Sequence, residues 1–238
     1  VEIIPPGFIN FRLSSSFRSD LINQILREKE NYGSNKSGKN KKVQLEFVSV
    51  NPTGPVHVGH ARGAIVGSCL ANVLSYSGFD VHKEYYVNDA GNQIDLYIRS
   101  IKSKIYEKFN QSFPFPQNGY KGKNIEIISE KITKELQITE TNLTKIDDKK
   151  IRDKAIDLTL NAIKKDLIDL GIEYDNWFYE SSLFTNKTIE SIEKILDKKN
   201  LLYKQDGAKW FRSSSFFTDE DVVINRSDDD GHTYFFSD

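Results

Sequence analysis

The spacing of hydrophobic residues changes along the chain and predicts alternating strands and helices. Residues 42–50, KVQLEFVSV, are rich in β-branched and aromatic residues and end at Asn51-Pro52, which is typical of a strand that runs into a turn. Residues 60–77 have helical spacing, and Gly78 is placed to end that helix. Residues 79–89, FDVHKEYYVND, supply a second strand. Strand, helix and strand in this order predict a parallel βαβ unit and an open α/β sheet. The face of the helix that we expect to be buried consists of Ala61, Ile65, Cys69, Leu70, Val73 and Leu74.

The pattern on either side of this unit predicts further domains. Residues 3–13 alternate weakly and residues 15–33 have helical spacing, which indicates the end of a small α+β domain. The spacing is again helical from about residue 97 to 200, and the last thirty residues contain strand-like runs. We therefore expect five segments: the end of an amino-terminal domain (1–33), a polar, lysine-bearing linker (34–42), the first half of the open α/β domain (43–98), a helix-rich insertion (99–205) and strands that return to the sheet (206–238).

Composition and charge restrict the function only loosely. The 238 residues carry a net charge near −1, which indicates no global affinity for polyanions but leaves a local RNA-binding surface open. No apolar stretch approaches the roughly 18 residues that span a bilayer, and no secretory signal is present, so we expect no membrane association. The single cysteine, Cys69, cannot form an internal disulfide, which fits the cytoplasm. Because the chain lacks methionine, we expect it to be a fragment of a longer protein.

Two of the four histidines, His57 and His60, lie three residues apart at the predicted start of the helix. Free backbone N–H groups and the positive end of the helix dipole make such a position an anion site, and two imidazoles could donate to phosphate oxygens. Gly59 would let a planar group, such as an adenine ring, approach the backbone. Histidines at this spacing could also share a metal ion or face solvent by chance. The spacing alone leaves all three interpretations open.

Other polar residues are predicted to lie on the same rim of the sheet. Ligands bind beyond the carboxyl ends of the strands in open α/β sheets, which brings residues 51–60 together with Asn88 and Asp89. Asn88, Asp89 and Gln93 could contact a ligand or only form a turn. Arg62 could meet a phosphate or remain solvated, and Cys69 is expected to pack against apolar neighbours.

The segment EFVSVNPTGPVHVGHARGAIVGSCLANVLSYSGFDVHKEYYVNDAGNQI resembles the signature region of class I aminoacyl-tRNA synthetases, and within them the arginyl-tRNA synthetases. The segments PGFINF, YVNDAGNQI, LGIEYDNWFYESSL and TYFFSD are similar to other parts of that family. The resemblance implies a Rossmann-like (HUP) parallel sheet with a helix-rich insertion. It also implies a ligase that activates L-arginine with ATP and Mg²⁺, without a structural metal, and transfers the arginine to tRNA(Arg). A monomer is expected.

The resemblance also implies roles for individual residues. His57, Gly59 and His60 would bind ATP, with His57 and His60 stabilising the transition state of adenylate formation. Ser49 and Asn51 would hold the α-amino end of arginine with His57 nearby, and Glu46, Tyr234 and Asp238 would surround the guanidinium. A guanidinium has five donors in a fixed plane, so carboxylates and a planar neighbour suit it.

The sequence departs from the family pattern at two positions. Val50 stands where a small residue or proline is expected, which could reshape the arginine pocket. Gly54 stands where some members carry a lysine, so we expect a K-M-S-K-like lysine loop elsewhere in the whole protein. Two other classes of function are weighed against the ligase: a non-catalytic RNA-binding relic, and a small-molecule nucleotidyl transferase. The guanidinium-pocket residues argue against the first, and PGFINF with the helical insertion argues against the second.

Overall fold

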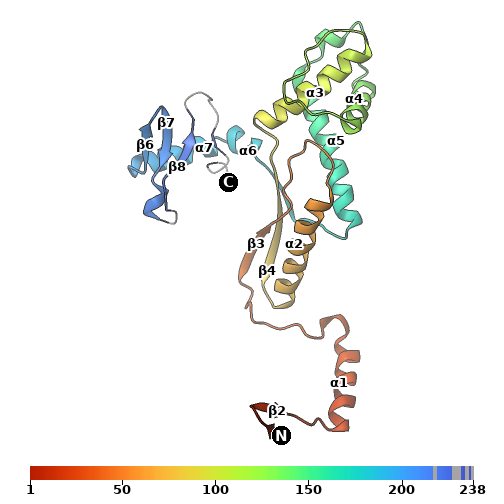
Figure 1. Ribbon diagram of the computed structural model, residues 1–238, viewed down its shortest axis with the longest axis vertical. Coiled ribbons are helices and arrows are strands. Elements are labelled where there is room, and N and C mark those ends of the chain that lie inside the picture. The colour runs from red at the N-terminus through yellow and green to blue at the C-terminus, as the bar shows by residue number, and fades with distance from the viewer. Residues whose placement is uncertain (217–218, 227–231, 234–235, 237–238) are drawn as a thin grey trace. The chain divides into compact units, whose positions relative to one another are not determined.

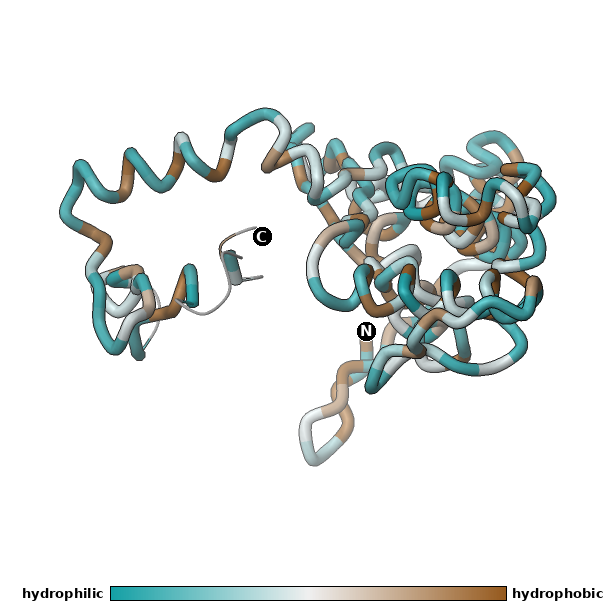
Figure 2. The backbone as a smooth tube through the Cα atoms, turned by 90° about the horizontal axis from the view of Figure 1, so that it is seen from above, coloured by the Kyte–Doolittle hydropathy of each residue, from teal (hydrophilic) through white to brown (hydrophobic). Residues whose placement is uncertain are grey.

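The computed structural model describes residues 1–216, 219–226, 232, 233 and 236. The chain divides into two compact units, one formed by Val1–Val43 with Cys69–Val81 and the other by Gln44–Ser68 with His82–Asp238. Each unit is described by itself below. No described helix is long and apolar enough to cross a membrane. Along the tube in Figure 2, hydrophobic residues recur at intervals between hydrophilic ones.

The first unit begins with an antiparallel hairpin and a helix. β1 (Glu2–Ile4) pairs with β2 (Phe8–Asn10), and α1 (Ser15–Glu28) follows and leads into the short 3-10 helix η1 (Lys29–Asn31). The hydroxyl of Ser14 accepts a hydrogen bond from the Phe17 N–H, which caps the start of α1. The first unit therefore contains a strand pair and a helix, where the spacing of residues 3–33 predicts one strand and a helix.

Residues 35–41 of the same unit are bonded to the segment that ends α2 (Val58–Tyr76). The amides of Asn35, Gly38 and Asn40 donate to the carbonyls of Tyr76, Ser77 and Gly78 over 2.7 to 3.0 Å. A Cβ on the buried Gly38 would lie 2.5 Å from the Phe79 backbone nitrogen, so only glycine fits this close approach. This polar stretch is therefore an ordered part of the fold.

A three-stranded sheet has the order β3 (Lys42–Glu46), β4 (Asp80–Val87) and β5 (Asn176–Tyr179). β4 and β5 are parallel, with Glu84 opposite Asn176 and Val87 opposite Tyr179. The Glu84 carboxylate accepts from Gln44 of β3 and from Asn176 of β5, each over 2.6 Å, which links the three strands. The predicted parallel α/β sheet is thereby confirmed. β5 lies within the range 99–205 that the hydrophobic spacing assigns to a helix-rich insertion.

Three long helices form the main core after β4. They are α3 (Asn92–Lys108), α4 (Lys123–Glu135) and α5 (Asp148–Asp169), with the short 3-10 helix η2 (Leu143–Lys145) between the last two, and they pack on one another (Figure 1). Ile94, Ile98, Ile101 and Ile105 place one face of α3 in the core. Asp147 caps α5 by accepting from the Lys149 N–H, and Gly171, at φ +74°, follows its end.

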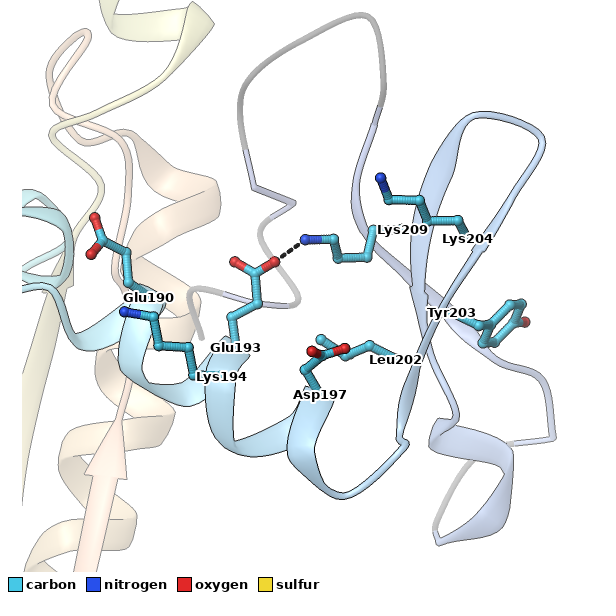
Figure 3. Close-up of a pocket in the computed structure, with 8 residues that line it drawn as sticks. All are labelled: Glu190, Glu193, Lys194, Asp197, Leu202, Tyr203, Lys204 and Lys209. Carbon is cyan, nitrogen blue, oxygen red and sulfur yellow. Dashed lines mark hydrogen bonds and ion pairs between the residues drawn. The ribbon is translucent and has the colours of Figure 1, made fainter.

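The last described elements form a small antiparallel sheet beside two helices. α6 (Ser181–Thr185) and α7 (Thr188–Lys198) precede β6 (Leu202–Gln205) and β7 (Ala208–Phe211). The short 3-10 helix η3 (Ser213–Ser215) follows, and β8 (Val222–Asn225) completes the sheet in the order β6-β7-β8. Asp206 and Gly207, both at positive φ, form the tight turn between β6 and β7. A cavity of about 520 Å³ lies between α7 and this hairpin, and Glu193 of α7 points toward Lys209 of β7 across it (Figure 3).

Candidate active site

The chain turns sharply where it leaves β3, and two residues without glycine's freedom take up the strain. Val48 has φ +69° and Ser49 has φ +40°, a region that β-branched residues in particular seldom occupy. Such a conformation costs about 1–3 kcal/mol and persists only where the surroundings enforce it. Left-handed residues of this kind gather at ligand sites, which draws attention to residues 47–51.

Hydroxyl groups from neighbouring elements hold this loop. The Tyr85 hydroxyl accepts from the Val50 N–H over 3.1 Å and donates to the Val50 carbonyl over 3.0 Å. The Tyr174 hydroxyl donates to the Phe47 carbonyl over 3.0 Å, and the Tyr86 N–H donates to the Ser49 hydroxyl over 3.0 Å. Burial raises the pKa of both Tyr85 and Tyr174, so both hydroxyls stay protonated and able to donate. The strained loop is therefore fixed at three of its backbone groups and at one side chain.

The two histidines lie at the start of α2, as the sequence predicts. Their rings are stacked with centroids 3.6 Å apart. The Gly59 N–H donates to Nδ1 of His57 over 3.1 Å, and the His57 N–H donates to Nδ1 of His60 over 3.3 Å. Because each Nδ1 acts as an acceptor, the proton of each neutral ring lies on Nε2, which is left as a donor. Burial, and then the neighbouring His57, lower the pKa of His60 and favour its neutral form.

Gly59 is exposed, and a Cβ there would lie only 3.0 Å from the His57 ring. A side chain at position 59 would therefore crowd the ring that accepts the Gly59 N–H. The glycine keeps this hydrogen bond possible and leaves the helix terminus uncovered.

Two cavities meet at the histidine pair. One, of about 470 Å³, is lined by Ser49, Asn51, His57, His60 and Tyr120, and is called the polar cavity below after these side chains. The other, of about 340 Å³, is mainly apolar; it is lined by Val56, Ala61 and Ala64 and by Leu167 and Leu170 of α5. His57, His60 and the strained Val48 border both. The paired imidazole donors thus border both the polar cavity and the mainly apolar one.

A hydrogen-bonded rim connects the ends of the three sheet strands. The Asn51 side-chain amide donates to Gln93 over 2.6 Å. Asp89 accepts from the N–H and the hydroxyl of Ser181, over 2.9 and 2.7 Å, which holds the start of α6. Asn88, in the amide orientation that matches its neighbours, donates to the Glu180 carboxylate over 2.6 Å. Asn88, Asp89 and Gln93 therefore take part in the rim.

Glu180 is a site residue that the hydrophobic spacing missed. It follows β5 directly, its side chain is 5 % exposed, and its N–H donates to the Val87 carbonyl. Its carboxylate accepts from Asn88, and its position at the carboxyl edge of the sheet makes it a candidate ligand group. The strand Asn176–Tyr179 that precedes it contains three aromatic residues in a row, which is the signal available in the sequence.

Several other predicted positions have different surroundings. Glu46 is exposed at the end of β3 and lines neither cavity, and Arg62 is exposed on α2. Tyr234 and Asp238 lie outside the described residues. Among the described residues, no group of three His, Cys, Asp or Glu side chains is placed to hold a metal ion.

The predicted buried face of α2 is wrong in the described structure. Cys69, expected to pack, is exposed, and so are Ile65, Leu70 and Val73. The buried positions are Ala64 and Ala71, at 1 % and 2 % exposure. A Cβ on Gly67 would lie 2.3 Å from Cγ of Phe47, so α2 packs through small residues because the loop after β3 approaches it closely.

Comparison with known proteins gives consistent results. Residues 21–238 match a family model described as "tRNA synthetases class I (R), catalytic domain". The chain is 40 % identical over 232 residues to an arginine–tRNA ligase of Shouchella clausii and 39 % identical over 240 residues to one of Listeria monocytogenes. These alignments cover 96 % and 100 % of the chain but only 41 % and 43 % of the relatives.

Solved structures give the same relationship. A structure named as an arginyl-tRNA synthetase from Campylobacter jejuni superposes with a TM-score of 0.79 at 32 % identity, covering 94 % of this chain and 49 % of that one. The arginyl-tRNA synthetase of Thermus thermophilus has a TM-score of 0.61 at 18 % identity, which supports the fold alone.

Proposed function

Because this chain belongs to the class I (R) tRNA synthetase catalytic-domain family, we propose that the whole protein is an arginine–tRNA ligase. It would join the carboxylate of L-arginine to the α-phosphorus of ATP with release of pyrophosphate, and then transfer the arginyl group to the 3′ end of tRNA(Arg) with release of AMP. Mg²⁺ would accompany the nucleotide, since it is normally held by phosphates and one or two carboxylates. We propose that the protein acts as a monomer in the cytoplasm.

The single observation that carries the proposal is the cavity that His57 and His60 share with Ser49 and Asn51. Nucleotidyl transfer needs no protein nucleophile, but it needs fixed donors where charge develops on the α-phosphate. Two Nε2–H groups at a helix amino terminus supply such donors without reorganisation. Ser49 and Asn51 line the same cavity and would hold the amino-acid end of the second substrate there.

We propose that the guanidinium pocket lies at the hydrogen-bonded rim, where β4 and β5 end. Glu180 is the buried carboxylate there, and Asn88, which donates to it, links it to the end of β4. Glu46, Tyr234 and Asp238 are retained as candidates on the family resemblance alone. A guanidinium that pairs with a buried carboxylate gains a charge-assisted, geometrically fixed contact that an ammonium forms less well. Such a pocket would favour arginine over lysine.

The division into five segments is proposed on the same basis. Residues 1–33 would end the amino-terminal tRNA-binding domain, with 34–42 joining it to the catalytic half-domain 43–98. Residues 99–205 would form the insertion, and 206–238 would return toward the sheet. The chain spans about two fifths of its curated relatives, so we propose that the 238 residues alone do not catalyse the reaction.

Thermal stabilisation by a non-hydrolysable arginyl-adenylate analogue tests the proposal in the whole protein. A ligand at a hundred times its Kd stabilises the native state by about 2.7 kcal/mol, whereas a lysyl-adenylate analogue should give a much smaller shift. Equal shifts would remove the arginine assignment, and no shift would remove the ligase assignment. Arginine-dependent ATP–pyrophosphate exchange by the 238-residue chain alone would contradict the proposed inactivity of the fragment.

A further inference from the structure

The Tyr85 hydroxyl makes an unusual pair of contacts. It bonds both the N–H and the carbonyl of one residue, Val50, over 3.1 and 3.0 Å. Tyr85 is fully buried at 0 % exposure, and its ring stacks on Trp177 with centroids 4.2 Å apart. A hydroxyl on a side chain held this firmly has little freedom to follow the loop, so the loop must conform to the hydroxyl.

The residues on either side of Val50 are the ones that need to be positioned. Val48 and Ser49 precede it at φ +69° and +40°, and Asn51 follows it. Ser49 and Asn51 both line the polar cavity. The other bonds that hold this stretch lie before Val50: the Ser49 N–H donates to the Phe47 carbonyl over 3.1 Å, and Tyr174 and Tyr86 contact Phe47 and Ser49. The Tyr85 hydroxyl is the contact that holds the Val50 end of the strained pair.

We infer that Tyr85 is a positioning residue: its hydroxyl fixes the Val50 peptide groups and thereby aims Ser49 and Asn51 into the polar cavity that receives the amino-acid substrate. The inference rests on the proposed function for the identity of that substrate. The positioning itself is independent of it. His57 and His60 are placed by the hydrogen bonds at the start of α2 rather than by the Tyr85 hydroxyl. The inference therefore concerns the binding of the amino acid and not that of ATP.

The test variant is Tyr85→Phe, which keeps the ring and removes the hydroxyl. Tyr97→Phe is its matched control, because Tyr97 is also fully buried and its hydroxyl bonds Thr159 over 2.8 Å within the helical core, away from the loop. In the whole protein, Tyr85→Phe should raise the KM for arginine in ATP–pyrophosphate exchange about tenfold, the equivalent of about 1.4 kcal/mol, or about one net hydrogen bond. The KM for ATP should change less than threefold, and Tyr97→Phe should change neither.

Hydrogen exchange of the peptide spanning residues 47–52 gives a second readout that needs no activity. Tyr85→Phe should speed exchange there, and Tyr97→Phe should not. An unchanged arginine KM with unchanged exchange, or equal effects of the two variants, would overturn the inference. If the unaltered whole protein does not activate arginine, the proposed function fails. The positioning role is still tested by hydrogen exchange: faster exchange in Tyr85→Phe supports it, and unchanged exchange overturns it.

Discussion

Gly67 and Gly63 lie on the same helix but face very different surroundings. A Cβ on Gly67 would lie 2.3, 2.5 and 2.6 Å from Cγ, Cδ2 and Cβ of Phe47, whereas a Cβ on Gly63 would meet nothing within 4 Å. Carbon atoms pack best at about 3.5–4.0 Å, so Gly67→Ala must displace the Phe47 side chain by about 1 Å. Its ring has limited room to move, since it packs on Tyr174 with centroids 4.7 Å apart.

Comparing Gly67→Ala with Gly63→Ala separates the cost of overpacking against Phe47 from the higher helix propensity of alanine. Replacing a glycine inside a helix by alanine stabilises by about 0.5–1 kcal/mol, and this gain applies to both sites. Overpacking costs about 1–3 kcal/mol and applies only to Gly67→Ala. The difference in free energy of unfolding between the two variants is therefore the overpacking cost alone. Gly63→Ala should be more stable than the unaltered protein, and Gly67→Ala less stable or unchanged.

Thermal unfolding followed by circular dichroism measures this difference. At about 2–4 °C per kcal/mol for a domain of this size, the midpoint of Gly67→Ala should lie several degrees below that of Gly63→Ala. A midpoint for Gly67→Ala equal to or above that of Gly63→Ala would refute the close approach of α2 to the loop after β3. Gly67→Ala should also raise the KM for arginine, because Phe47 directly precedes Val48, the first of the two strained residues.

Two further predictions concern protonation. The pKa of His60 is lowered by burial and by His57, so the unfolded chain takes up a proton on His60 before the folded one. Stability should fall as the pH drops below the ordinary histidine value of about 6.5, and His60→Gln should show a smaller fall when unfolding is measured across that range; identical slopes would contradict this. Partial burial on its own would raise the pKa of Glu193, but the Lys209 and His232 contacts outweigh it and lower it. The pair in Figure 3 therefore stabilises the fold above the ordinary carboxyl value and ceases to do so as the pH falls through the lowered one. Glu193→Gln should lose about 0.5–1 kcal/mol at neutral pH and nothing in acid, as denaturant titrations at the two pH values would show; an equal loss at both would point to packing instead.

The local sequence predicts much of the sheet and the histidine pair. Strand, turn and helix over residues 42–76 have clear periodicities, and His57 and His60 fall at the helix start as expected. The buried side of α2 could not be read from hydrophobicity, because the helix packs through Ala64, Gly67 and Ala71 and leaves larger residues exposed. Where a helix and a loop approach closely, small residues fit and large apolar ones do not. The periodicity of large apolar residues therefore does not reveal which face is buried.

The strained turn and the buried acid were also beyond local sequence patterns. Val48 and Ser49 adopt positive φ without a glycine, and they lie between Phe47 and Val50, which tyrosine hydroxyls hold. Those contacts join residues 35 or more positions apart. Glu180 becomes a rim residue only because β5 pairs with β4 across 92 positions. Long-range pairing of this kind leaves only a short aromatic run in the sequence.

Residues 35–41 show that a segment with the composition of a linker need not be flexible. Its lysines, glycine and polar residues have the makeup of a flexible tether, yet its amides are bonded one after another to the end of α2. A tether extends when its ends are pulled apart, but this segment can extend only by breaking that ladder. These hydrogen bonds therefore hold the segment against the end of α2, and the distance between its two ends cannot increase unless they break.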